Sequence, residues 1–164
     1  MKSVTGIALS ALLLMGCSQE ASLPEEPVET VEESETTETP SPTAPGPCDV
    51  SSERAMGQTI GAQIDAFRAG DYAAAYDLAA PAFQANVSLE AFQFVIESGY
   101  SSLLEARSHT LSDCVLFPLD LGNTVVTVRT VSDEVFTYYY ELINTDQGWR
   151  ILGASEIAPV SSGA

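Results

Sequence analysis

Apolar residues change their spacing near residue 106 of this 164-residue chain, and this change constrains the fold more than any other feature. Upstream, Met56, Ile60, Ile64 and Phe67 recur at intervals of four, four and three residues, which places them on one face of a helix. Downstream, apolar and polar residues alternate at every second position, as in strands with one buried face. The sequence therefore predicts helices first and strands afterwards.

The helical part divides into three predicted helices. Ser51 or Ser52 is expected to cap the first helix, which ends at Gly70. The second helix covers residues 72–79 and the third covers residues 88–99. The third helix is expected to bury four apolar side chains, those of Leu89, Phe92, Val95 and Ile96.

Four strands are predicted in the second part, at residues 107–117, 124–131, 135–143 and 149–157. Only short turns separate the last three strands, so successive strands must pair antiparallel. Helices followed by a meander indicate an α+β domain, with three helices packed on one face of a curved four-stranded antiparallel sheet. This domain is expected to occupy residues 48–164.

Aromatic residues dominate the predicted interior. The third strand alternates so that Tyr138 and Tyr140 share one face with Phe136. We expect the main pocket or core side chains to be Phe67, Phe92, Tyr138, Tyr140 and Trp149. Such large groups in a small domain are expected to serve mainly as packing, since interiors approach crystal density.

The first seventeen residues read as an export signal. Lys2 gives a positive start, and residues 7–15 form an apolar run that is too short to span a bilayer. The run ends in Leu14-Met15-Gly16-Cys17, which resembles the bacterial lipobox. The resemblance implies a signal peptide at residues 1–16, cleavage before Cys17 and acyl chains on that cysteine. An ordinary secretory signal with a chance cysteine is the alternative.

Residues 17–47 are expected to form a lipidated, disordered tether that holds the domain off a membrane. The segment contains eight glutamates and no basic residue, and it has too few large apolar side chains to fold. The net charge of the whole chain is −17, which excludes a nucleic-acid surface. Ser18, where an Asp tends to retain lipoproteins in the inner membrane, favours the outer membrane of the cell envelope. Possible partners are a small ligand or an envelope protein.

Two cysteines remain after Cys17 is assigned to lipid. Export places Cys48 and Cys114 in an oxidising compartment, where leftover thiols commonly pair. We therefore predict a disulfide between them, with two unpaired buried thiols as the alternative. Together with the single His109 they match no known zinc spacing, so no metal or other cofactor is expected.

Several segments resemble a family called domain of unknown function 4864. They are Ala66-Phe67-Arg68-Ala69-Gly70-Asp71-Tyr72-Ala73-Ala74-Ala75-Tyr76, Ala80-Pro81-Ala82-Phe83, Phe92, Gly99-Tyr100 and Gly148-Trp149-Arg150-Ile151-Leu152-Gly153. The family in turn is similar to the nuclear transport factor 2-like superfamily, in which helices cover a curved sheet to form a cone. The resemblance implies a fold and no activity.

Two functions remain open. The domain either binds a ligand or partner without catalysis, or it is a small isomerase or dehydratase that uses a pocket carboxylate or His with a Tyr. Strict alternation would place His109 and Asp113 on one face of the first strand, about 13 Å apart. Turning that face inward would turn Cys114 outward and weaken the argument for the disulfide, so the two interpretations are coupled. We favour the non-catalytic function and assign no catalytic residue.

Overall fold

The computed structural model describes residues 42–158. The predicted signal peptide, Cys17 and most of the predicted tether lie outside these residues, as do the last six residues of the chain. The helices are α1 (Val50–Ala69), α2 (Tyr72–Asp77), α3 (Pro81–Gln84), α4 (Leu89–Gly99) and α5 (Ser101–Leu104). The strands are β1 (Gly46–Pro47), β2 (Ala106–Phe117), β3 (Leu121–Thr130), β4 (Val135–Thr145) and β5 (Gly148–Glu156).

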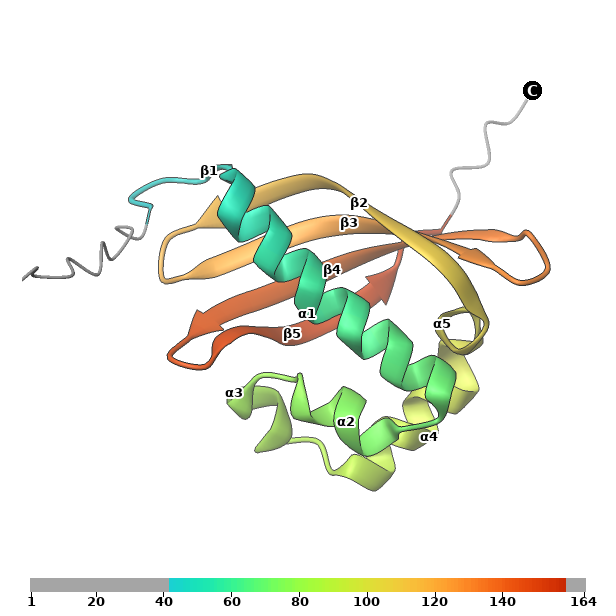
Figure 1. Cartoon of the computed structure of the whole chain (residues 1–164). Coiled ribbons are helices and arrows are strands. Elements are labelled where there is room, and N and C mark those ends of the chain that lie inside the picture. Colours follow the sequence, from blue (N-terminus) through green and yellow to red (C-terminus); the bar gives the residue numbers. More distant parts are fainter. Residues whose placement is uncertain (1–41, 159–164) are drawn as a thin grey trace, which may run out of the picture. The chain divides into compact units, whose positions relative to one another are not determined.

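The strands form one antiparallel sheet in the order β1-β2-β3-β4-β5. Helix α1 lies across one face of this sheet (Figure 1). The shorter helices extend the same layer, with α3 in contact with β5 and α5 in contact with β3. The prediction of an α+β domain with an antiparallel sheet is confirmed. Its detail differs, because the described residues form five helices and five strands instead of three and four.

The additional elements have local causes. Pro81 starts α3, since its fixed φ suits a first helical position and its missing N–H is not needed there. Helix α2 ends at Asp77 because the following backbone pairs with β5, where the Ile151 N–H donates to the Leu78 carbonyl. The two residues of β1 pair with Val115 and Leu116, so the sheet begins two residues before Cys48.

The apolar face of α1 is buried as its spacing predicts, with Met56 and Ile60 fully inaccessible. The predicted cap is wrong by two or three residues. Asp49 is the N-cap, and its carboxylate accepts from the Ser51 and Ser52 backbone N–H groups at 2.8 and 3.0 Å. A carboxylate next to the helix start is also favoured by the helix dipole.

Helix α4 buries a narrower stripe than its sequence predicts. Phe92 and Ile96 are each 6% exposed, one turn apart on the same face. Leu89 and Val95 are 39% and 48% exposed, so the prediction that they are buried is wrong. Leu89 is the first residue of the helix and Val95 lies at the edge of the stripe, where the layer meets solvent.

A β-bulge in β2 breaks the strict alternation that the sequence analysis assumed. The register with β3 shifts between Ser112 and Val115, and Asp113 has a φ of 51°. Asp tolerates this left-handed conformation better than most residues. The Ser112 carbonyl accepts a hydrogen bond from the buried Thr124 hydroxyl at 2.8 Å. As a result, residues on the two sides of the bulge no longer follow one parity.

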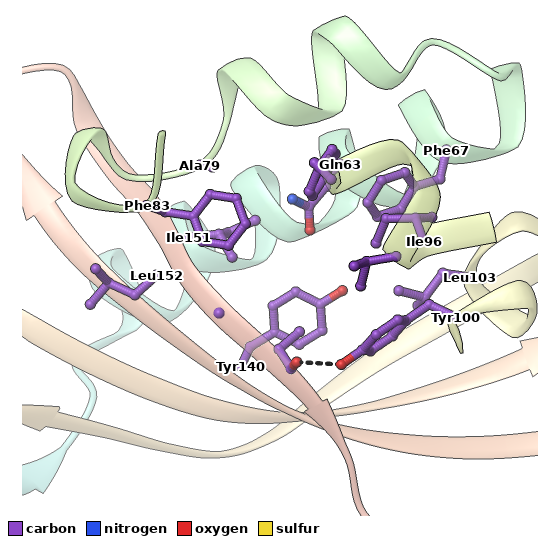
Figure 2. Close-up of a pocket in the computed structure, with 14 residues that line it drawn as sticks. Gln63, Phe67, Ala79, Phe83, Ile96, Tyr100, Leu103, Tyr140, Ile151 and Leu152 are labelled. Atoms are coloured by element: carbon purple, nitrogen blue, oxygen red, sulfur yellow. Dashed lines mark hydrogen bonds between the residues drawn. The ribbon is translucent and has the colours of Figure 1, made fainter. Parts of the chain in front are cut away.

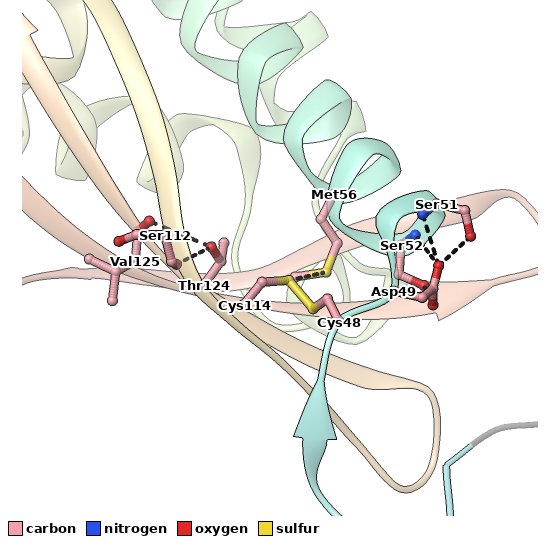
Figure 3. The surroundings of a disulfide bond; sticks show 9 residues. All are labelled: Cys48, Asp49, Ser51, Ser52, Met56, Ser112, Cys114, Thr124 and Val125. Carbon is pink, nitrogen blue, oxygen red and sulfur yellow. Dashed lines mark hydrogen bonds between the residues drawn. A yellow bond between two sulfur atoms is a disulfide. The ribbon is translucent and has the colours of Figure 1, made fainter.

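The predicted disulfide between Cys48 and Cys114 is confirmed, with a Cα–Cα distance of 5.4 Å (Figure 3). The Cys48 N–H also donates to the Cys114 carbonyl at 3.1 Å, and Met56 packs against the pair. The bond therefore fastens the start of α1 to β2.

No helix within the described residues is long and apolar enough to cross a membrane.

Candidate functional site

A cavity of about 150 Å³ lies between α1, α4 and the β4–β5 half of the sheet (Figure 2). Most of its wall is aromatic or aliphatic. The principal apolar side chains are those of Phe67, Phe83, Phe92, Ile96, Leu103 and Ile151. Among the described residues that line it, none is Asp, Glu, His, Lys or Arg. The cavity therefore suits an uncharged, largely apolar guest.

Aromatic rings from four helices pack together on one side of the cavity. Phe92 of α4 lies 5.8 Å from Phe67 of α1 and 5.9 Å from Phe83 of α3, between ring centroids. Tyr76 of α2 packs against Phe92 at 5.5 Å, and its hydroxyl donates to the Val87 carbonyl at 2.6 Å. These tilted and edge-on contacts are favourable for aromatic pairs, so they hold the helical side in place.

Three polar side chains also line the cavity, and two of them are already bonded. The Tyr100 hydroxyl donates to the Ala154 carbonyl at 3.0 Å. The amide of Gln63, which is 4% exposed, donates to the Ala75 carbonyl at 3.4 Å. The third, Tyr140, is fully buried, and its hydroxyl has no hydrogen-bond partner within the part of the chain that is described.

The electrostatics of the two inward tyrosines of β4 follow from burial. Desolvation raises the pKa of Tyr140 far above its usual range, with a smaller contribution from Tyr138. Desolvation also raises the pKa of Tyr138, although its hydroxyl shares a hydrogen bond with Ser102. Both phenols are therefore neutral across the physiological pH range, and Tyr140 can donate or accept one hydrogen bond.

A family model described as "Domain of unknown function (DUF4864)" matches residues 50–162, more than half of the chain and nearly all of the folded part. The chain belongs to this family. No curated protein matches the chain. The match confirms the family resemblance seen in the sequence, and it leaves the activity of the DUF4864 domain to be argued from the site.

The pocket or core residues expected from the sequence fall in two places in the DUF4864 domain. Phe67, Phe92 and Tyr140 line the cavity. Tyr138 is buried beside it without lining it, and it stacks on Tyr100 with ring centroids 6.0 Å apart. Trp149, which is 8% exposed, lies near Met56 and Gly122, away from the cavity lining.

His109 and Asp113 do not come together with the inward tyrosines. His109 packs against α1, because a Cβ added to Gly61 would lie 3.3 Å from His109 Nε2. It borders a separate surface groove near the start of α1. Asp113 is exposed on the bulge. The prediction that His109 and Asp113 share one face of β2 is wrong. The bulge interrupts the alternation, so His109 and Cys114 both face the helical layer.

Sequence reasoning missed the polar groups that the helices bring to the cavity. Gln63 follows Met56 by seven residues, which is two helical turns, so it falls on the apolar face of α1. A polar residue on such a face was the available signal. Tyr100 lies at the α4–α5 junction, just after the predicted end of the third helix at residue 99. In the described part, no group of three His, Cys, Asp or Glu side chains could hold a metal.

Proposed function

We propose that this protein is a lipid-anchored lipoprotein of the bacterial cell envelope, whose domain binds a small and mostly apolar molecule without transforming it. The observation that carries the binding role is the cavity of about 150 Å³, with its apolar wall and a Tyr140 hydroxyl that has no hydrogen-bond partner among residues 42–158. Protein interiors are ordinarily packed with few voids larger than a water molecule, so a space of this size is a candidate binding site.

The N-terminal sequence supports the anchor. Residues 1–16 have the charge and the apolar run of a signal peptide, and Cys17 stands where a lipobox cysteine is acylated. Acidic residues and prolines in residues 18–47 suit a spacer, with a maximum reach of about 100 Å. We place the domain in the periplasm or another extracytoplasmic space, with the outer membrane favoured.

The proposed fold is the cone of the nuclear transport factor 2-like superfamily. An antiparallel meander with helices on one face, and a cavity between the helices and the last strands, supports this assignment. In such an arrangement, a ligand reaches the inner face of the sheet where Tyr140 lies.

Binding is better supported than isomerase or dehydratase chemistry. General acid–base catalysis needs a group that gives or takes a proton near the working pH. The cavity-lining residues with acid–base potential are Tyr100 and Tyr140, and burial raises the pKa of Tyr140 further from neutrality. His109 and Asp113, the residues considered for catalysis, lie elsewhere.

An NMR titration of the full-length protein with benzene tests the cavity. Benzene should shift the methyl signals of Ile96 and Leu103 saturably, because both side chains line the space. Ile96→Phe should abolish the response by filling the cavity. Val131→Phe is the matched control, since it enlarges a side chain that is 65% exposed and outside the cavity lining. No saturable shift in the wild type would rule out the binding role.

Mass spectrometry of the protein isolated from membranes tests the anchor. The mature chain should begin with an acylated Cys17, and Cys17→Ser should move the protein to the soluble fraction. Two results together would exclude the lipid anchor: the Cys17→Ser variant stays on the membrane, and the wild-type protein still carries residues 1–16. Density-gradient separation of the two membranes then tests the preference for the outer one.

A further inference from the structure

We propose that the cavity selects an uncharged molecule about the size of one six-membered ring, carrying a single oxygen that hydrogen-bonds to the Tyr140 hydroxyl. This inference rests on the proposed binding function and adds the chemical class of the ligand. It follows from three properties of the cavity: its volume, the Tyr140 hydroxyl that has no partner in the described part of the chain, and the lack of charge among the described lining residues.

The volume sets the size of the ligand. An engineered apolar cavity of about 150 Å³ in another protein stays dry and accepts benzene. The cavity here has about the same volume, with a wall of similar aromatic and aliphatic groups. A ring with one small substituent matches this volume, and a second ring held inside the cavity would meet side chains such as Phe92 and Ile96, which are packed into the core.

The hydroxyl of Tyr140 determines which polar group the ligand carries. A buried polar group without a partner is destabilising by the cost of removing it from water, so such groups are rare and mark special sites. The neighbouring polar side chains each make a hydrogen bond within the domain: Tyr138 with Ser102, Tyr100 with Ala154, and the Gln63 Nε2 with Ala75. Figure 2 shows the Tyr140 ring among the lining side chains, with its hydroxyl inside the cluster. A ligand oxygen placed there supplies the missing hydrogen bond.

The absence of charged groups among the described lining residues determines that the ligand binds in an uncharged form. A carboxylate in the cavity would lose its hydration and meet no cation among the described lining residues. An ammonium group would meet no carboxylate there for the same reason. The raised pKa of Tyr140 keeps its hydroxyl neutral, so it pairs with a hydroxyl or carbonyl oxygen and gives no ionic attraction.

Competing probes test the inference on the full-length protein: benzene, phenol and benzoate at neutral pH. In the wild type, the ratio of phenol affinity to benzene affinity should be about five- to ten-fold higher than in Tyr140→Phe, as expected for the loss of one hydrogen bond. The cost of dehydrating phenol is the same for both proteins, so it cancels when the phenol-to-benzene affinity ratio of the wild type is compared with that of Tyr140→Phe. Tyr138→Phe is the matched control and should keep the wild-type ratio, because Tyr138 does not line the cavity.

The outcomes separate this inference from the proposed function. If benzene and phenol both bind and Tyr140→Phe leaves their ratio unchanged, the role of the hydroxyl is overturned while the binding function stands. If benzoate binds as tightly as phenol, the requirement for an uncharged ligand is overturned. If neither benzene nor phenol binds, both the inference and the binding function fail.

Discussion

Helix α1 has two ends with opposite packing. At the disulfide end, defined by Cys48, Met56, Cys114, Gly122 and Trp149, a Cβ added to Gly122 would lie 3.1 Å from Met56 Sδ and from Trp149 Cη2. The cavity end, defined by the residues that line the cavity, keeps a space of about 150 Å³. One helix thus joins a region that is closely packed around Gly122 to a region that keeps a cavity.

The comparison teaches that stability and binding are separated along α1. The start of the helix is held by a covalent bond, a carboxylate cap and close packing around the single tryptophan. These contacts can stabilise the domain while the other end remains unfilled. Substitutions at the disulfide end should therefore lower the free energy of unfolding, whereas removal of the Tyr140 hydroxyl at the cavity end should change binding with little effect on stability.

The largest effect is expected for Trp149→Ala. Its ring is 8% exposed and packs at the disulfide end, so truncation should lower the free energy of unfolding by about 3–5 kcal/mol. Phe94→Ala is the matched control, because Phe94 is 70% exposed, and it should change stability by no more than about 0.5 kcal/mol. Urea denaturation measures both. Equal losses in the two variants would contradict the assignment of Trp149 to the core.

Removing the disulfide should have the next largest effect. The bond closes a loop with a sequence separation of 66, for which chain-entropy arguments give a stabilisation of at most about 4 kcal/mol. Cys48→Ser combined with Cys114→Ser should lower the free energy of unfolding, measured by urea denaturation, by up to this amount. Adding a reductant to the wild type should reproduce the shift and leave the double variant unchanged. A wild type that does not respond to complete reduction would contradict the prediction.

Loss of the α1 cap should cost less. Asp49→Ala should destabilise the domain by about 1 kcal/mol at neutral pH. Hydrogen bonds from the Ser51 side chain, then from Ser52, hold the pKa of Asp49 well below its usual range. A depressed pKa means that the stabilisation is present above the unfolded pKa of about 4 and is lost as the pH falls through the folded value. The difference between wild type and variant should therefore shrink below about pH 4, and a constant difference down to pH 2 would exclude this origin.

The smallest effects, and the sharpest contrast, concern the paired tyrosines of β4. Tyr138→Phe should cost about 1 kcal/mol, because it leaves the buried Ser102 hydroxyl without its partner. Tyr140→Phe should be neutral or slightly stabilising, since the hydroxyl that it removes is unpartnered within the described residues. Thermal unfolding of both variants is the measurement. A loss in Tyr140→Phe that equals the loss in Tyr138→Phe would show that its hydroxyl is bonded in the folded protein.

Sequence reasoning succeeded where one element decides the outcome. The apolar face of α1 follows from the spacing of Met56 and Ile60, and the inward direction of Tyr138 and Tyr140 follows from alternation along β4. The order of helices and strands needs no knowledge of their packing. The disulfide was predicted from export and from the number of remaining cysteines, without a distance.

The tertiary structure alone decided how these elements meet. A one-residue irregularity at Asp113 reverses the facing of every later residue in β2, because side chains alternate along a strand. It lets His109 and Cys114 both face the helices, which strict alternation forbids. The cavity has the same kind of origin. Its walls come from four helices and two strands that are distant in sequence, and the space left between rings depends on their relative placement, which periodicity within one element does not encode.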